Sequence, residues 1–448
     1  MVNKIIIMLF MFVNIFLSFN SNLLIEDISG ISFISKREQT LENSSINSDF
    51  ELENFVIENG YHGNGSKINP YIINNLSYGY SFKNISKYFV ISNSIFYNQY
   101  TNYNLKICDS NSISLNSCVF RNSSYGVILQ NISNVNLSNC TFKYLNTSIY
   151  SEEADNLSIT DSNFIMYENQ IGIDIFTSNN SYLYNNNFSG GLVGCYTRFS
   201  NNSNISSNTF SNQYRSPIFL REINTSCLFR NEISFSTVVT CYHIDDIHIE
   251  NNKIMGSNSD AKEYFQGGFS VQLIKEGIIK NNIFDCKGLS LHLTSFYKDS
   301  TSSIFILNNT IFGSEIGISA GNSNIINNTV IHSTYGIKMV SYSICKNNKL
   351  SNNSIGISLR NSIGCKIYNN SICSNNYGTA FDISSGETSM DFNEIINNTI
   401  FGCRYGVFFN STEAGNVLFN NTILNSTISG IRMMNSDGQI IKRNVIQN

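Results

Sequence analysis

The chain has 448 residues, of which 42% are hydrophobic and only 13% are charged, with a formal net charge of -4. No run of lysine and arginine occurs in it, which excludes the basic footprint of a nucleic-acid-binding protein. Its 11 cysteines include no C-x-x-C pair, which excludes zinc-ribbon and thioredoxin-type motifs.

The first 22 residues have the pattern of an export signal, because Lys4 supplies a positive charge and residues 5–19 are mostly apolar. At ~1.5 Å per residue this apolar stretch reaches roughly 22 Å as a helix, short of a ~30 Å hydrocarbon core. We therefore predict a signal peptide at residues 1–22. The alternative is an uncleaved N-terminal anchor, which would be the chain's only contact with a membrane. Both alternatives predict an extracellular, cell-surface or periplasm-like envelope location.

Three regions follow this segment. Residues 23–45 are polar and are predicted to form a linker. Residues 46–80 precede the clear repeats and are predicted to cap the exposed end of a repeat array. Residues 81–448 carry the repeats themselves.

A phrase with two parts recurs along this last region. The first part is a glycine followed by alternating apolar residues, as in Gly336-Ile-Lys-Met and Gly356-Ile-Ser-Leu. The second part is an apolar residue, a spacer and an asparagine pair, and such pairs begin at residues 251, 281, 308, 327, 347, 369, 397 and 420. Alternation by two is the period of a β-strand, so we expect no sustained helix after the signal. Repeats of roughly 24 residues predict a parallel β-solenoid of about fifteen coils.

The repeated asparagines predict a hydrogen-bonded ladder. When identical turns stack at ~4.8 Å, amide side chains at one corner donate to and accept from the amides of neighbouring coils. Cys345 and Cys365 occupy positions that are apolar in other repeats, so we expect buried thiols there. One or two disulfides between stacked coils are the alternative in an oxidising compartment.

The phrase GNGSKINPYII at residues 63–73, followed by the asparagine-rich coils, resembles the opening of NosD-like proteins. These are pectin-lyase-like proteins of the carbohydrate-binding and sugar-hydrolase β-helix group, of archaeal or bacterial surface type. The resemblance covers residues 55–448 and implies an all-β fold, a single-stranded right-handed parallel β-helix. One relative is linked to copper. The five histidines of this chain form no cluster with Met or Cys, so we predict no metal and no cofactor.

One stretch combines acidic, basic and imidazole side chains. In DIHIE at residues 246–250 the two isoleucines fit inward positions, which leaves Asp246, His248 and Glu250 on one outward row. Lys280 and Glu250 each immediately precede an asparagine pair, which places them roughly 5 Å apart on adjacent strands. These four residues are the candidate catalytic groups of a polysaccharide lyase or glycoside hydrolase. The alternative is an ordinary ion pair between coils beside a solvated His248.

Elsewhere the outward positions carry fewer side chains that could act as acids, bases or ligands. Asp174 is a lone acid and is predicted to be a solvated strand residue. Asp174 lies two residues after a glycine. The same position in later repeats is predicted to be mostly small and polar, at Ser270, Ser290, Ser319 and Ser358, with Lys338 and Arg432 as the exceptions. Tyrosines that precede the phrase glycine either stack on sugar rings or pack at a corner; they are Tyr335, Tyr377 and Tyr405.

The paired aspartates and R-x-K phrase of polygalacturonases are not found in order. We therefore predict a surface or envelope protein that binds a polysaccharide or a cell-surface protein without catalysis. The alternative is a carbohydrate-active enzyme that uses the charged cluster.

Overall fold

The computed structural model describes residues 44–97, 102–256, 267–295, 303–360, 362–382, 390–410 and 415–447. The predicted signal or anchor and most of the predicted linker lie outside these ranges. Within them, no helix combines the length and the apolarity that crossing a membrane would require.

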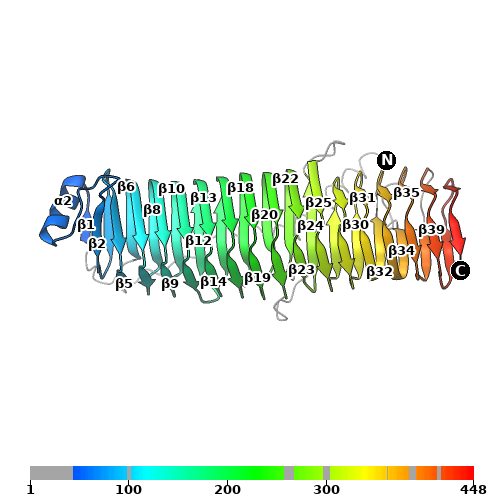
Figure 1. The fold of residues 1–448 in the computed structure, drawn as a ribbon, viewed down its shortest axis with the longest axis horizontal. Coiled ribbons are helices and arrows are strands. Elements are labelled where there is room, and N and C mark those ends of the chain that lie inside the picture. Colours follow the sequence, from blue (N-terminus) through cyan, green and yellow to red (C-terminus); the bar gives the residue numbers. More distant parts are fainter. Residues whose placement is uncertain are drawn as a thin grey trace, which may run out of the picture. The chain divides into compact units, whose positions relative to one another are not determined.

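The described chain winds as a right-handed parallel β-solenoid of about 16 turns, which confirms the predicted fold and its roughly fifteen coils. Every pairing between its named strands is parallel, and each strand pairs with the strands one turn before and after it (Figure 1). The turns form three ladders of strands around a common interior. Residues far apart in sequence therefore lie side by side whenever they occupy the same position in successive turns.

Six long strands run from the first ladder into the second: β6 (Tyr103–Asn116), β8 (Tyr125–Ser138), β10 (Thr147–Thr160), β18 (Ser216–Phe229), β20 (Val239–Glu250) and β22 (Phe269–Lys280). Two run from the third ladder into the first ladder of the next turn: β32 (Lys349–Arg360) and β34 (Ser371–Asp382). The other strands of the first ladder are β1 (Ser44–Ile46), β3 (Tyr80–Lys83), β12 (Ile171–Phe176), β15 (Val193–Arg198), β24 (Leu289–Ser295), β27 (Ile316–Ala320), β30 (Tyr335–Met339), β37 (Tyr405–Asn410) and β40 (Ser429–Met434).

The other strands of the second ladder are β2 (Tyr71–Asn74), β4 (Phe89–Ser92), β13 (Asn179–Tyr184), β16 (Asn201–Ser206), β25 (Ser303–Leu307), β28 (Asn324–Ile326), β31 (Ile344–Lys346), β33 (Lys366–Tyr368), β35 (Glu394–Ile396), β38 (Val417–Phe419) and β41 (Ile440–Lys442). Those of the third are β5 (Ile95–Tyr97), β7 (Val119–Arg121), β9 (Thr141–Lys143), β11 (Asn163–Ile165), β14 (Asn187–Ser189), β17 (Thr209–Ser211), β19 (Glu232–Ser234), β21 (Lys253–Met255), β23 (Ile283–Asp285), β26 (Thr310–Phe312), β29 (Thr329–Ile331), β36 (Thr399–Phe401), β39 (Thr422–Leu424) and β42 (Val445–Gln447).

A helix of 10 residues precedes the first complete turn, in a region where we expected no sustained helix. Helix α2 (Asp49–Glu58) begins after Ser48, whose side chain accepts a hydrogen bond from the backbone N–H of Glu51. Acidic residues in its first turn favour a helix N-terminus. Its buried Leu52 and Val56 join the solenoid core. The strand periodicity of the repeats therefore does not extend to this short capped segment.

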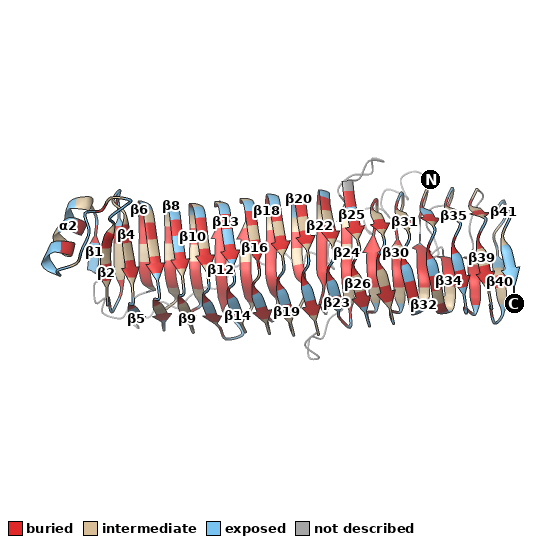
Figure 2. Cartoon of the chain, in the orientation of Figure 1, coloured by how far each residue is buried: buried red, intermediate tan, exposed pale blue. Residues whose placement is uncertain are grey.

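The interior contains stacks of like residues, as predicted. Figure 2 shows buried positions repeating from strand to strand along the ladders. Among the described residues, the longest run of stacked aromatic rings is a column of phenylalanines whose ring centroids lie 4.5 to 4.9 Å apart, formed by Phe96, Phe120, Phe142, Phe164, Phe188 and Phe210. Each ring is buried by its neighbours, so a single turn could not shield its own aromatic side chain from water.

The asparagine ladder is confirmed, and the two residues of each pair have different roles. Asn308 is exposed and has a φ of 53°, in the left-handed region that asparagine tolerates. Asn309 is buried and donates from Nδ2 to Asn328 Oδ1 at 3.0 Å. Its own Oδ1 accepts from the backbone N–H of Asn282 at 3.0 Å and from Asn282 Nδ2 at 2.9 Å. The second asparagine of each pair therefore forms the ladder.

The recurrent glycines have a packing role. In the stack that includes Gly336 and Gly356, an added Cβ on Gly336 would lie 2.6 Å from the backbone oxygen of Gly356. Glycine is needed there for close approach of neighbouring turns. Cys345 and Cys365 are buried as predicted, and all 11 cysteines are free thiols.

Candidate functional site

The predicted charged cluster lies together on the outer face of the second ladder. The isoleucines of DIHIE are fully buried, while the side chains of Asp246, His248 and Glu250 point outward and are partly exposed. His248 Nε2 lies 3.4 Å from Asp246 Oδ2, and His248 Nδ1 lies 3.8 Å from Glu250 Oε1. Lys280 pairs in register with Glu250, and its Nζ lies 3.1 Å from Glu250 Oε1. The predicted placement of all four residues is confirmed, whereas their catalytic role stays a prediction.

This arrangement favours binding of hydroxyl groups. Both ring nitrogens of His248 lie within 4 Å of carboxylate oxygens, and Lys280 is paired with Glu250. Partly exposed carboxylates and an imidazole accept and donate hydrogen bonds to a polar ligand. Among the described residues, no set of three His, Cys, Asp or Glu side chains is arranged to hold a metal ion.

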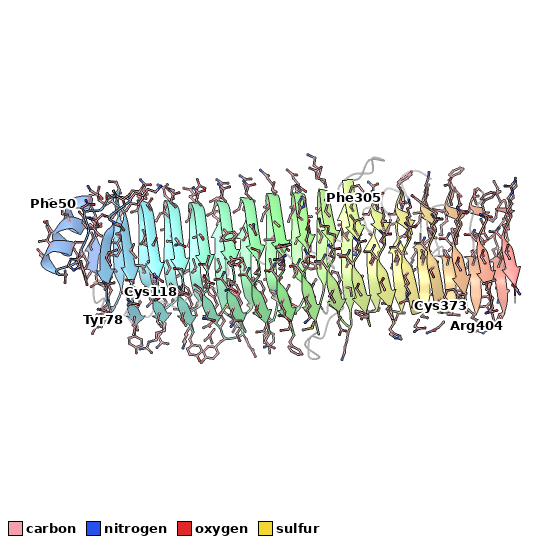
Figure 3. All side chains as sticks on the ribbon, viewed as in Figure 1. Phe50, Tyr78, Cys118, Phe305, Cys373 and Arg404 are labelled. Carbon is pink, nitrogen blue, oxygen red and sulfur yellow. The ribbon has the colours of Figure 1, made fainter. Side chains whose placement is uncertain are left out.

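Exposed aromatic rings lie in the same column as His248. Strand register places Tyr182 three strands before His248. Phe305 of β25 lies two strands after it (Figure 3). Tyr182 is 38% exposed and Phe305 is 37% exposed. Tyr184 lies beside Tyr182, with ring centroids 5.8 Å apart and an interplanar angle of 8°. Motif searching missed these rings because their alignment depends on turns of unequal length.

A hollow of about 280 Å³ adjoins this face at the corner between the first and second ladders. Three successive turns line it, and the side chains that matter for its chemistry are those of Phe199, Asn201, Glu222, Asn224, His243 and Asp245. Asp245 immediately precedes Asp246 of the charged cluster. The hollow and the outer face of the second ladder are therefore neighbours.

Asp174 is not the lone solvated residue that we predicted. It is buried, and both of its carboxylate oxygens accept hydrogen bonds from Arg198 Nη2, at 3.2 and 3.0 Å. The Arg198 guanidinium also lies over the rings of Phe176 and Tyr196, 5.1 and 4.7 Å from their centroids. Burial raises the pKa of the Asp174 carboxyl, and the charge of Arg198 opposes that shift. Aligning Gly172 with Gly194 would have revealed this contact between turns.

The predicted row of small polar residues needs one correction. Ser290 occupies the stacked glycine position and hydrogen-bonds Ser314 in the interior, because the phrase around Gly288 is shifted by two residues. His292 takes the outward position beside Ser270. Burial, followed by the charge of Lys338, lowers the pKa of His292.

The tyrosines that precede the glycine of the repeated phrase pack against one another at a corner of the solenoid. The rings of Tyr377 and Tyr405 stack with centroids 5.4 Å apart, and Tyr405 is buried. Arg432 Nη1 donates a hydrogen bond to the Tyr405 hydroxyl at 2.6 Å. Tyr335 lies in the same column and contacts the Lys338 ammonium through its ring face, at 5.8 Å from the ring centroid.

A family model described as the right handed beta helix region matches residues 125–273 and 294–446. Among solved structures, the chain is similar to the A-module of the Azotobacter vinelandii mannuronan C-5 epimerase AlgE6, with 12% identity, a TM-score of 0.39, and coverage of 82% of this chain and 91% of that one. It is also similar to the periplasmic alginate epimerase AlgG, with 12% identity, a TM-score of 0.28, and coverage of 90% and 84%.

A third similar structure is the catalytic domain of a GH87 α-1,3-glucanase in complex with tetrasaccharides, with 12% identity, a TM-score of 0.22, and coverage of 92% and 70%. No curated protein matches the sequence. These identities are too low to transfer an activity to this chain.

Proposed function

The chain belongs to the right-handed β-helix family, and we propose that it binds a polysaccharide along the outer face of the second ladder without catalysis. The observation that carries this proposal is the column in which the charged cluster around His248 lies between Tyr182 and Phe305. Exposed aromatic faces pack against the C–H faces of sugar rings, and the cluster between them offers hydrogen bonds to hydroxyl groups.

The spacing of this column fits an extended chain. Tyr182 and Phe305 are separated by five strand steps, which corresponds to roughly 24 Å at ~4.8 Å per step. Such a span suits several linked sugars better than one. Because the rings project from a hydrogen-bonded parallel sheet, little ordering of the protein is needed on binding, which favours affinity.

We further propose that the protein acts outside the cytoplasmic membrane, as the N-terminal segment with Lys4 and the apolar residues 5–19 predicts. A polysaccharide of a cell surface would be accessible there. A cell-surface protein is the alternative partner. Cell fractionation with an antibody to the chain tests the location, and recovery only from the cytosol would contradict it.

A panel of neutral and acidic polysaccharides, measured both for binding and for cleavage, tests the function. We expect at least one to bind. Truncating one exposed ring, as in Tyr182→Ala or Phe305→Ala, should remove about 1 kcal/mol, or roughly fivefold in Kd. The matched control is Tyr167→Ala, because Tyr167 is 62% exposed but lies outside the second ladder. A panel without any binder, or ring variants that bind like the wild type, would contradict the proposal.

A carbohydrate-active enzyme is the second candidate, and one observation favours it. His248 has carboxylates within 4 Å of both ring nitrogens, and Lys280 completes a set of acid, base and charge-stabilising groups. Release of reducing ends or unsaturated products from the same panel would reveal it. Such activity should disappear in the double variant His248→Ala and Lys280→Ala, and survival of the activity would exclude this cluster as its site.

A further inference from the structure

The corner hollow beside the second ladder is built from a strained stretch of backbone. The corner position is left-handed in eight successive turns, with φ between 48° and 56°; its residues are Asp109, Asn131, Glu153, Thr177, Phe199, Glu222, His243 and Leu273. At the hollow, the same position holds Phe199, Glu222 and His243, with φ of 52°, 53° and 56°.

A left-handed conformation costs most residues about 1–2 kcal/mol, and Asn and Asp tolerate it best. From Glu153 to Leu273, six successive turns carry residues other than Asn or Asp at this position. Backbone strain of this kind motivates a functional hypothesis where the side chains share a site. Three of the six do so, because Phe199, Glu222 and His243 line the hollow.

The chemistry of the hollow suits a single sugar residue. The ring of Phe199 is 44% exposed and offers a stacking face. Arg221 Nε donates to Glu222 Oε1 at 3.1 Å, which orients the carboxylate. Asp245 and the exposed His243 imidazole add hydrogen-bonding groups for hydroxyls. At about 280 Å³ the hollow lies just under the ~300–1,000 Å³ of drug-sized ligand pockets, so it accepts one ring rather than a long segment.

The charges of the hollow select against acidic sugars. Glu222 and Asp245 are both acidic, and Arg221 pairs with Glu222, so the carboxylates outnumber the guanidinium group by one. A uronate carboxylate would meet this excess negative charge, whereas a neutral hexose presents only hydroxyl donors and acceptors.

We propose that the corner hollow binds one neutral sugar residue, as a side branch of the polysaccharide that lies along the second ladder. The inference rests on the proposed function, because Asp245 in the hollow directly precedes Asp246 in the face that binds the main chain. The main chain contacts Tyr182 and Phe305, and the branch enters the hollow between Phe199 and Asp245.

Saturation-transfer NMR on the full chain tests this inference, with the methyl glycosides of glucose, galactose, mannose and galacturonic acid as probes. We expect at least one neutral glycoside to bind and the galacturonide not to bind. Glu222→Gln removes a charged acceptor and should weaken neutral binding roughly tenfold. Glu153→Gln is the matched control, because Glu153 has the same left-handed conformation, with φ of 52°, two turns before Phe199 and outside the hollow.

His243→Asn separates binding from folding. Asparagine suits the left-handed backbone better than histidine, so this variant should fold at least as stably as the wild type while binding the neutral glycoside roughly tenfold more weakly. The inference is overturned if no neutral glycoside binds, if the galacturonide binds equally well, or if Glu222→Gln and His243→Asn keep wild-type affinity. Polysaccharide binding that depends on Tyr182 while the glycosides fail to bind would overturn the hollow alone and leave the proposed function standing.

Discussion

Replacing Asn309 by alanine tests the ladder that holds successive turns in register. The Asn309 side chain donates to the backbone oxygen of Ile279 and to Asn328, and it accepts twice from Asn282. Alanine removes all four hydrogen bonds at a buried position. Asn282 Nδ2 keeps its bond to the oxygen of Ile249, and Asn328 Oδ1 keeps the bond from the backbone of residue 309.

The backbone N–H of Asn282 then loses its partner, and the carbonyl oxygen of Ile279 loses the bond from the side chain. Leaving one buried polar group unsatisfied costs about 1–3 kcal/mol, so Asn309→Ala should destabilise the chain by at least that amount. The neighbouring Asn308 is exposed and left-handed, with a φ of 53° that glycine adopts freely. Asn308→Gly should therefore change stability by less than about 1 kcal/mol.

Urea denaturation followed by far-ultraviolet circular dichroism compares the two variants with the wild type, and amide hydrogen exchange gives the local readout. We expect a lower midpoint and faster exchange at the Asn282 amide in Asn309→Ala only. Repeat arrays unfold with limited cooperativity, so midpoints and exchange rates are compared directly instead of extrapolated free energies. If the Asn282 amide stays as protected in Asn309→Ala as in Asn308→Gly, the ladder does not stabilise the stack as argued.

Three further changes have defined outcomes. Gly336→Ala places a Cβ 2.6 Å from the oxygen of Gly356 and should cost about 1–3 kcal/mol through overpacking, seen as a lower urea midpoint; an unchanged midpoint would contradict the close approach. Burial lowers the pKa of His292 in the folded chain below the ordinary value of 6.5. As the pH falls below 6.5, the unfolded chain binds a proton at this residue before the folded chain does, so stability is lost until the pH passes the folded-state pKa. His292→Gln should therefore lose less stability than the wild type between pH 7.5 and pH 5 in the same assay, and identical pH profiles would refute this. Asp174→Ala leaves the Arg198 guanidinium unpaired and should cost about 3–5 kcal/mol by thermal denaturation, most of which the added change Arg198→Met should recover.

The fold was predictable because its signals are local and repeated. Alternation by two assigns the inward and outward faces of a strand without knowledge of its partners, and this correctly placed the side chains of Asp246, His248 and Glu250. The asparagine pair also marks the same corner in every turn, so counting back from it gave the correct pairing of Glu250 with Lys280.

Where that marker is absent, the register was harder to infer. The phrase at Gly288 is shifted by two residues, and the glycine position of that turn is held by Ser290, so His292 was assigned to no outward row. Helix α2 was missed for a related reason, since its capping signal at Ser48 lies outside the repeats.

By itself, the sequence determined the strand period, the inward and outward faces and the stacked asparagines, because each depends on residues close together in the chain. Only the tertiary structure decided which side chains meet across turns: the pairing of Asp174 with Arg198, the column from Tyr182 to Phe305 and the corner hollow. Turns of unequal length bring these residues together. Their contacts therefore depend on the register of the whole stack, which no short segment encodes.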